Sequence, residues 1–297
     1  MKVLLNDGLS PNGQKVLKEN GIEFDAIHYE KDELLEKIGE YDGMIVRSAT
    51  KVTKAVIDAG KKLKAIGRAG TGIDNIDHEY AKTKNIPVLN TPGANSASVS
   101  ELVFAHFFAL ARFFPQTKSS MIDGEWNKKK FKGFELAGKT LGIIGFGRIG
   151  TITARMALAF GMKVMAYDVA EIETDLDVEV ASKEEVLKHA DFITLHVPKL
   201  PKPVIGKAEI AMMKDSAYVV NCSRGNMVEE PALLDALNND KLAGAGLDVW
   251  ENEPAFNKDL AKHPKVSPSP HIGANTYDAL DRVGIQIAEK MVAELNK

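Results

Sequence analysis

The chain of 297 residues has a single cysteine, Cys222, and no large excess of either charge. One cysteine excludes an internal disulfide framework and suits a reducing compartment. A net charge of −3 provides no field that would collect nucleic acid or an anionic membrane. We therefore expect neither as a partner, and a negatively charged substrate must be held by local cations.

Long apolar runs and internal repeats are also missing. No run approaches the roughly 20 residues that span a bilayer, and Met1 leads directly into the strand-like sequence KVLL without a signal peptide. The hydrophobic content of 44% and charged content of 27% are typical of an ordinary soluble globular protein. The expected location is the cytoplasm, and the length suits two domains.

The stretch 140–168 carries the clearest motif. The short apolar run 141–144 predicts a buried strand, and it leads into the glycine turn GFGRIG at 145–150. Apolar residues at helical spacing follow, and a second apolar run, 164–167, closes on Asp168. The order is strand, glycine turn, helix, strand and acid, as in dinucleotide-binding folds.

Each position of this motif has a mechanical reason. Gly145 allows the tight turn, Gly147 lets a pyrophosphate approach the backbone, and Gly150 lets the helix lie against the strand. The helix N-terminus offers free N–H groups to the anion. Asp168, eighteen residues past Gly150, is placed to accept hydrogen bonds from the ribose hydroxyls and to repel the 2′-phosphate of NADP. The motif predicts NAD; the competing interpretation is a structural strand-to-helix turn.

Residues 1–92 precede this motif and alternate short apolar runs with amphipathic segments, which predicts a parallel α/β unit. They contain no GxGxxG sequence. A whole domain therefore precedes the cofactor domain.

A change of composition begins at Ser98. Ser98 and Glu101 have the spacing of a capping box, and 102–110 is apolar on nearly every face, which predicts a buried helix between domains or subunits. Residues 115–139 are expected to be looser. The lysines at 128, 129, 130 and 132 favour a solvated loop, and the alternative is an anion-binding loop offered across an interface.

Polar residues end several of the later predicted strands. The runs 192–197, 217–221 and 243–249 end near His196, Arg224 and Asp248, and a further run from Val266 leads to His271. Ligands of open α/β sheets bind beyond the carboxyl ends of strands. These residues are therefore the best site candidates.

A nicotinamide enzyme needs a group that exchanges a proton with the substrate oxygen, and histidine suits this because its pKa lies near working pH. Of the seven histidines, only His196 and His271 follow strand ends. His106 lies inside the buried helix, where a core or interface role is favoured. His271 is followed by the flexible sequence IGAN and is the preferred acid or base.

A catalytic histidine usually has a carboxylate partner, and Glu253 lies past a strand end in a segment that Pro254 prevents from being helical. Glu251 competes with it, and spacing alone does not choose. Arg224 suits a substrate carboxylate or keto oxygen because its planar fork donates two parallel hydrogen bonds. Cys222 is a conceivable nucleophile, but the apolar strand YVVNC favours a core role.

These residues resemble the D-isomer-specific 2-hydroxyacid dehydrogenases over nearly the whole chain. Six motifs match in order: RSAT at 47–50, GRAGTGIDN at 67–75, NTP at 90–92, NCSRG at 221–225, DVWENEP at 248–254 and PHIG at 270–273. Several matched motifs in the right order are more specific than any one. One departure is Asn226, which stands where relatives often have a second glycine.

The resemblance implies an α/β fold with two Rossmann-like or flavodoxin-like parallel-sheet domains joined by two crossings. Residues 1–92 plus 275–297 would form the substrate-binding domain, and 93–274 the NAD-binding domain. The family typically dimerises through its cofactor domains, so a homodimer is expected.

The resemblance also assigns roles to individual residues. The catalytic group would comprise Arg224, Glu253 and His271. The residues assigned to NAD binding are Gly145, Gly147, Arg148, Ile149, Gly150, Asp168, His196, Pro198, Cys222, Ser223, Asp248 and Gly273. Those assigned to substrate binding are Arg47, Ser48, Gly70, Thr71, Gly72, Asn95 and Lys128. No metal is expected.

Within the family, the similarity is greatest to members that oxidise 3-phospho-D-glycerate with NAD to 3-phosphohydroxypyruvate, the first step of phosphorylated serine biosynthesis. The alternative is a broad enzyme acting on glyoxylate, hydroxypyruvate or D-lactate. A non-enzymatic NAD-sensing corepressor on the same scaffold is less favoured. The chain ends at Lys297, soon after the helix that follows His271, so we expect no C-terminal regulatory domain and no serine feedback through one.

Overall fold

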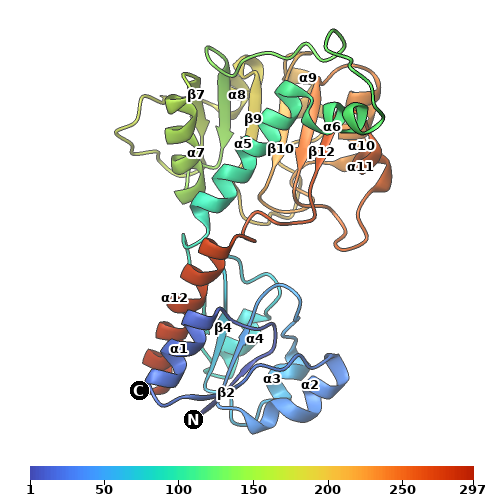
Figure 1. Cartoon of the computed structure of the whole chain (residues 1–297). Coiled ribbons are helices and arrows are strands. Elements are labelled where there is room, and N and C mark those ends of the chain that lie inside the picture. Colours follow the sequence, from blue (N-terminus) through green and yellow to red (C-terminus); the bar gives the residue numbers. More distant parts are fainter. The chain divides into compact units, whose positions relative to one another are not determined.

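The computed structural model describes all residues from 1 to 297 and divides them into two compact units. The first unit comprises 1–95 and 274–297, and the second comprises 96–273. Each unit is built on one fully parallel sheet (Figure 1). The predicted α/β class with two parallel sheets is confirmed, whereas the binding role of each unit stays a prediction.

The sheet of the first unit has five strands in the order β2-β1-β3-β4-β5. Its strands are β1 (Lys2–Leu5), β2 (Glu23–Asp25), β3 (Gly43–Val46), β4 (Ala65–Arg68) and β5 (Val88–Leu89). Its helices are α1 (Pro11–Glu19), α2 (Lys31–Lys37), α3 (Lys54–Ala59), α4 (His78–Thr83) and α12 (Tyr277–Leu295), with a 3-10 turn at Ile38–Glu40.

Successive side chains of β1 pack in different cores, which shows that helices cover both faces of this sheet. Val3 and Leu5 pack in the core formed with α1 and α12, whereas Leu4 packs on the other face with residues of α2 and α3. Successive side chains of a strand point to opposite faces. Because both faces are covered by helices, this strand is apolar at every central position rather than alternating with polar residues.

The sheet of the second unit has seven strands in the order β12-β11-β10-β9-β6-β7-β8. Its strands are β6 (Thr140–Ile144), β7 (Lys163–Tyr167), β8 (Glu179–Val180), β9 (Phe192–Leu195), β10 (Tyr218–Asn221), β11 (Gly244–Leu247) and β12 (Val266–Pro268). Its helices are α5 (Ser96–Arg112), α6 (Phe114–Ile122), α7 (Arg148–Ala159), α8 (Lys183–His189), α9 (Lys207–Met212), α10 (Glu230–Asn238) and α11 (Lys258–Lys262). Residues of α5 and α7 share one core, and residues of α8, α9 and α10 share another.

The order in which the strands are added to this sheet reverses at β6. The chain runs from β6 to β7 on one side and then returns to pair β9 with the other side of β6. Connections that leave two adjacent strands in opposite directions open a crevice at their carboxyl ends, where ligands of such sheets bind. The glycine turn at 145–150 and His196 both lie at these ends.

Of two expectations for 98–139, the first was wrong and the second holds only for 123–139, which contains no helix or strand. Helix α5 begins at Ser96, so Ser98 lies within the helix, where its hydroxyl donates a hydrogen bond of 2.7 Å to the Gly273 carbonyl instead of capping. The segment expected to be loose contains α6, with Pro115 in its first turn, a position where proline is tolerated because its missing N–H has no helical partner.

Helices α5 and α6 meet at a bend of 59°. Neither of them, nor any other single helix, is long and apolar enough to cross a membrane, although the bent pair together reaches that length and composition. Nine residues of α5 are buried within the second unit.

Candidate active site

The glycine turn after β6 is closely packed at two positions and open at the third. Gly145 has a φ of +96°, and a Cβ there would lie 2.6 Å from the His196 carbonyl oxygen. A Cβ on Gly150 would overlap the Gly145 carbonyl oxygen, whereas a Cβ on Gly147 would meet nothing within 4 Å. The first and third glycines are needed for local packing. The open side of Gly147 leaves room for a ligand to approach the backbone.

Asp168, at the end of β7, ties itself to this turn. Its Oδ2 accepts a hydrogen bond of 2.6 Å from the Phe146 N–H, and its Oδ1 accepts one of 3.0 Å from the Ala170 N–H. Helix α7 starts at Arg148 without a side-chain cap, so the N–H groups of its first turn, including that of Ile149, are available to an anion. These features fit a dinucleotide with its pyrophosphate at Gly147 and its ribose at Asp168.

His196 follows β9 on the opposite side of the crevice. Its N–H donates to the Ile144 carbonyl, and its buried Nδ1 has no hydrogen-bond partner. Burial lowers the pKa of His196 to about 3, so the ring is neutral. Pro198 lies two residues further on, exposed. His196 therefore lies beside the glycine turn as a neutral group and not as an acid.

Replacing Asp168 with serine is expected to weaken the preference for NADH over NADPH by roughly 10–100-fold. The variant loses a charge-assisted hydrogen bond to the ribose, worth about 1.5–3 kcal/mol, and loses the repulsion of the 2′-phosphate. The measurement is kcat/KM for each cofactor at saturating keto acid. Asp175→Ser, at an exposed position in the following loop, is the control. An unchanged cofactor ratio would contradict the role of Asp168.

The turn after β10 carries Arg224. Asn221 fixes this turn, because its side chain donates 2.9 Å to the Arg224 carbonyl and accepts from both the N–H and the hydroxyl of Ser223. The Arg224 guanidinium donates 2.8 Å to the Ser223 carbonyl. A Cβ on Gly225 would overlap the Trp250 carbonyl oxygen, so the turn packs closely on the neighbouring strand's loop. Asn226 has a φ of +64°, a left-handed conformation that asparagine tolerates better than most residues.

Cys222 lies at the start of the same turn, buried in the core. Burial raises the pKa of its thiol well above the ordinary value. A thiol in that state is a poor nucleophile. Its surroundings therefore match the core role that its apolar strand suggested.

A histidine–carboxylate pair joins His271, after β12, to Glu253, in the loop after β11. His271 Nδ1 lies 2.7 Å from Glu253 Oε2, and the other carboxylate oxygen accepts 3.0 Å from the Trp250 N–H. Because a carboxylate only accepts, Nδ1 carries the proton and Nε2 is the nitrogen directed away from the pair. The Glu251 side chain is exposed, and its backbone N–H donates 2.7 Å to Glu230 Oε1; the carboxylate that meets His271 is that of Glu253. The structure thus selects between the two glutamates that the sequence left open.

The pair shifts the titration of both partners. The hydrogen bond to Glu253 raises the pKa of His271, and this outweighs the opposing effect of burial. Burial acts to raise the pKa of Glu253, but the hydrogen bonds from His271 and Trp250 outweigh it and lower the pKa. The charged form of each group is therefore stabilised, and the histidine holds its proton to higher pH than a free imidazole does.

Replacing Glu253 with glutamine is expected to move the loss of reductive activity with rising pH to lower pH. Reduction needs protonated His271, and its raised pKa falls back toward 6.5 when the carboxylate is removed. The measurement is the pH profile of kcat/KM for keto-acid reduction. The neighbouring variant Glu251→Gln should leave the pH profile unchanged. A shift in Glu251→Gln and none in Glu253→Gln would show that Glu251, not Glu253, is the partner of His271.

A cavity of about 520 Å³ adjoins this pair in the second unit. Its walls are largely apolar, formed by Trp250, Phe256, Pro268 and Pro270. Asp248 and Gly273 lie nearby and hydrogen-bond each other, the Gly273 N–H donating 2.8 Å to Asp248 Oδ2. The triplet, Asp248 and the glycine turn thus all lie at the carboxyl edge of one sheet.

The residues predicted to contact substrate lie in the first unit, apart from Lys128. Thr71 Oγ1 donates 2.8 Å to Asn95 Oδ1, and its carbonyl accepts 2.7 Å from Asn90, so the Gly70-Thr71-Gly72 loop and Asn95 are held together. Gly70 has a φ of +148°. Lys128 lies on the exposed loop between α6 and β6. Its role stays a prediction.

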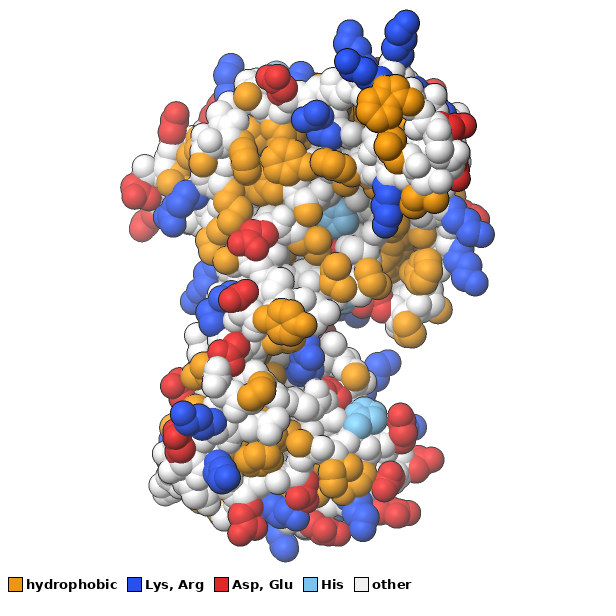
Figure 2. All heavy atoms as spheres, viewed as in Figure 1, with side chains coloured by type: hydrophobic (Ala, Val, Ile, Leu, Met, Phe, Trp, Pro, Cys, Tyr) orange, Lys and Arg blue, Asp and Glu red, His pale blue; other side chains and the backbone are white.

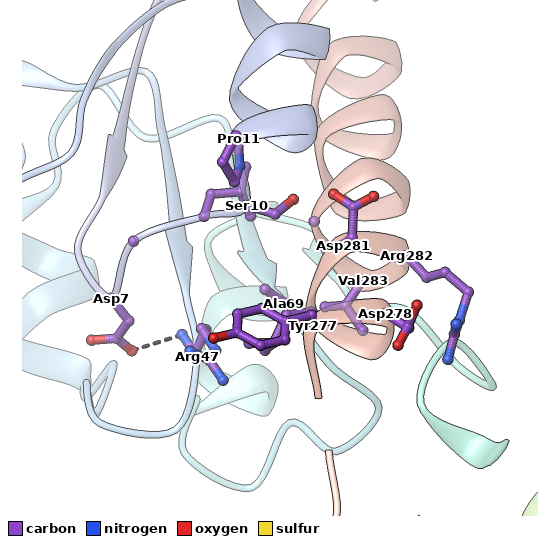
Figure 3. Close-up of a pocket in the computed structure, with 14 residues that line it drawn as sticks. Asp7, Ser10, Pro11, Arg47, Ala69, Tyr277, Asp278, Asp281, Arg282 and Val283 are labelled. Carbon is purple, nitrogen blue, oxygen red and sulfur yellow. Dashed lines mark hydrogen bonds between the residues drawn. The ribbon is translucent and has the colours of Figure 1, made fainter. Parts of the chain in front are cut away.

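Arg47, after β3, lines a cavity of about 710 Å³ between the Asp7–Pro11 loop and the first turns of α12 (Figure 3). Its N–H donates 2.7 Å to Asp7 Oδ2. Ser48 lines a second cavity of about 430 Å³ that also contains Arg47 and His28. Arg47 is thus placed at the junction of two hollows of the first unit, with an acid fixing its backbone.

Two residues with a place in the site were missed from the sequence. The sequence marks Asn221 only as a strand end, whereas in the structure its side chain fixes the Arg224 turn. No sequence pattern points to Ser269, whose hydroxyl lies 2.5 Å from Asp248 Oδ1. An asparagine at the last position of an otherwise apolar strand was the available indication for the first. Nothing local indicated the second.

Comparison with known proteins supplies the family. The model for the NAD-binding domain of D-isomer specific 2-hydroxyacid dehydrogenases matches residues 104–273. The chain belongs to the D-isomer-specific 2-hydroxyacid dehydrogenase family. It is 47% identical to a hydroxypyruvate reductase of Thermotoga maritima, over 99% of this chain and 98% of that relative.

Two further relatives illustrate the range of this dehydrogenase family. A D-3-phosphoglycerate dehydrogenase of Methanocaldococcus jannaschii is 46% identical over 98% of this chain, which spans 57% of that relative's length. The crystal structure of the TT0316 protein from Thermus thermophilus superposes with a TM-score of 0.92 and 32% identity, covering 100% of this chain and 97% of the other. The expected family and its NAD cofactor are confirmed, and the protein is an oxidoreductase of this family. The individual site roles stay predictions.

Proposed function

We propose that this dehydrogenase reduces short 2-keto acids to D-2-hydroxy acids with NADH, and that hydroxypyruvate is its main substrate. The observation that carries the chemistry is the 2.7 Å pair between His271 Nδ1 and Glu253 Oε2, on a loop next to the one that holds Arg224. The substrate is supported by the hydroxypyruvate reductase of T. maritima, which this chain matches over nearly the full length of both. From the sequence alone, the phosphorylated substrate ranked first. The comparisons favour the alternative.

Bound NADH supplies the hydride that adds to C2 of the keto acid. Arg224 holds the carboxylate and C2 oxygen through its planar fork. His271, protonated on both ring nitrogens, donates the Nε2 proton to the C2 oxygen, and Glu253 stabilises the imidazolium until that step.

Oxidation of 3-phospho-D-glycerate is the second candidate. It is favoured by the 46% identity to the M. jannaschii D-3-phosphoglycerate dehydrogenase over 98% of this chain. Arg47 and Lys128 are the cations available for its phosphate. Hydroxypyruvate and 3-phosphohydroxypyruvate differ only by the phosphoryl group, so the same triplet serves both.

The discriminating experiment measures NADH oxidation with hydroxypyruvate, 3-phosphohydroxypyruvate, glyoxylate and pyruvate. The proposal expects kcat/KM for hydroxypyruvate to equal or exceed that for its phosphorylated form. A preference of a hundredfold or more for the phosphorylated acid would overturn it. In that case Arg47→Ala plus Lys128→Ala should raise KM for the phosphorylated acid and leave glyoxylate unaffected.

We also propose that the protein forms a homodimer through its second unit. Figure 2 shows hydrophobic side chains gathered on the face of this unit that carries α5. Exposed apolar residues of the region include Phe114, Met121, Ile122, Trp126 and Phe160. Sedimentation of Phe114→Ser plus Ile122→Ser should give a monomer where the parent chain gives a dimer.

A further inference from the structure

Helix α5 carries a buried histidine that the mechanism above does not use. His106 is 3% exposed, and both of its ring nitrogens have partners. Nδ1 lies 2.9 Å from Ser267 Oγ and Nε2 lies 3.2 Å from Ser269 Oγ. Both serines belong to the segment that ends β12 and leads to His271. The ring therefore connects the core helix with the strand that delivers the acid.

The absence of a side chain at Gly246, on the neighbouring strand β11, makes this connection possible. A Cβ on Gly246 of β11 would lie 2.8 Å from the His106 Cβ and 2.9 Å from its Cγ. Any side chain at this position would displace the helix or the ring. The close approach of α5 to β11 thus allows His106 to reach Ser267 of β12 and Ser269, which follows the strand.

The donors and acceptors of the hydrogen bonds among Ser267, His106, Ser269 and Asp248 can be assigned. Ser269 Oγ lies 2.5 Å from Asp248 Oδ1 and donates its only hydroxyl proton to that carboxylate, which can only accept. The Ser269 oxygen must then accept from His106, so Nε2 carries the ring proton and Nδ1 accepts from Ser267. Burial lowers the pKa of His106, in agreement with a neutral ring that has one donor and one acceptor.

Asp248, 1% exposed, is where the chain meets the catalytic loop. Its Oδ1 also accepts 2.8 Å from the Ile272 N–H, and its Oδ2 accepts 2.8 Å from the Gly273 N–H. Its carbonyl accepts 2.7 Å from the His271 N–H. One aspartate thus binds three successive N–H groups of the loop.

The hydrogen bonds to Asp248 fix the backbone conformation of His271. The residue has a φ of +54°, a left-handed conformation that is uncommon for non-glycine residues, although histidine adopts it more readily than most; the hydrogen bonds around the loop hold it there. The sequence after it, IGAN, predicted a flexible segment. The structure shows a fixed loop instead, and Asp248 supplies its hydrogen bonds.

We infer that His106 is a positioning residue for His271, acting through Ser269 and Asp248 to hold the loop 271–273 in its catalytic conformation. The inference rests on the proposed role of His271 as the acid. His106 is almost fully buried, so it acts through its neighbours. It orients the Ser269 hydroxyl, the hydroxyl fixes one oxygen of Asp248, and the aspartate fixes the loop.

The first test is a double-mutant cycle on kcat for hydroxypyruvate reduction. His106→Leu and Ser269→Ala should each lower kcat about tenfold, less than the roughly hundredfold that a 1 Å displacement of a catalytic group can cause. The dissociation constant of NADH should change less than about twofold. Because both residues act through one path, the double variant should be no slower than Ser269→Ala alone. Multiplicative losses, or a His106→Leu variant with unchanged kcat, would overturn the inference.

Two further variants separate positioning from general stability. Val103→Ala removes buried volume one turn earlier on α5, where Val103 is 0% exposed; it should lower Tm and leave kcat unchanged. Ser269→Thr keeps the hydroxyl and should retain the parent kcat. If Val103→Ala slows the enzyme as much as His106→Leu at equal loss of Tm, His106 has only a structural role.

The last measurement does not depend on turnover. The NMR titration of His271 should show its pKa moving toward that of a free imidazole in His106→Leu and in Ser269→Ala, because a looser loop weakens the hydrogen bond to Glu253. If the parent chain turns over no keto acid while this shift occurs, the proposed function fails and the positioning role stands. If activity is present and the titration does not move in either variant, the positioning role fails.

Discussion

Replacement of His271 by alanine is expected to lower kcat for keto-acid reduction by roughly 10²–10⁴-fold, the range for loss of a positioned general acid. The side chain is half-exposed at the end of a fixed loop, with its Nδ1 committed to Glu253 and its Nε2 free of that pair. Water would have to supply the proton in the variant, without the orientation that the pair provides. Binding of NADH should be little changed, because the glycine turn and Asp168 are untouched.

The measurement pairs steady-state kcat with a direct titration of NADH binding. His189→Ala, an exposed histidine at the end of α8 in the same unit, is the matched control and should behave as the parent chain. If the His271→Ala variant keeps more than a tenth of the parent kcat, His271 is not the general acid of the reaction. Loss of NADH binding in parallel with kcat would instead show that the variant disturbs the cofactor site.

The glycine turn and its contact with Asp168 could be predicted from sequence because their determinants are local. Gly145, Gly147 and Gly150 act within one turn, and Asp168 ends the next strand, so the spacing alone fixes their relation. The order of strands then places His196 beside the turn, since ligands of a doubly wound sheet bind where the strand order reverses. In this chain the two strand ends lie so close that a Cβ on Gly145 would be 2.6 Å from the His196 carbonyl oxygen.

The catalytic pair was predictable only in part. Both Glu251 and Glu253 lie in the same short loop, and only the path of that loop decides which reaches His271. The path depends on Glu230, which binds the Glu251 N–H from α10, twenty-one residues away. No local pattern contains this contact.

The same limitation explains the errors around α5. Ser98 and Glu101 have capping-box spacing, yet the helix begins at Ser96, and the Ser98 hydroxyl donates to Gly273, 175 residues later, instead of capping. His106 was expected to have a core or interface role. Its partners Ser267 and Ser269 lie more than 160 residues away in sequence, so no local pattern links His106 to the catalytic loop.

Replacement of Arg224 by alanine is expected to lower kcat/KM for hydroxypyruvate by roughly 10²–10⁴-fold. The variant loses two charge-assisted hydrogen bonds to the substrate carboxylate and C2 oxygen, each worth about 1.5–3 kcal/mol. Arg224→Lys keeps the charge but loses the planar fork, so a loss of roughly 10–100-fold is expected. The graded series therefore separates geometry from charge at this position.

The measurement is kcat/KM across hydroxypyruvate, glyoxylate and pyruvate, with NADH binding followed separately. Arg155→Ala, an exposed arginine on α7, removes the same charge from the same unit and should leave all three values unchanged. All three acids share the 2-keto carboxylate, so the loss in Arg224→Ala should be similar for each. A loss confined to hydroxypyruvate would mean that Arg224 contacts the C3 hydroxyl instead of the carboxylate, and the proposed role of the planar fork would be wrong.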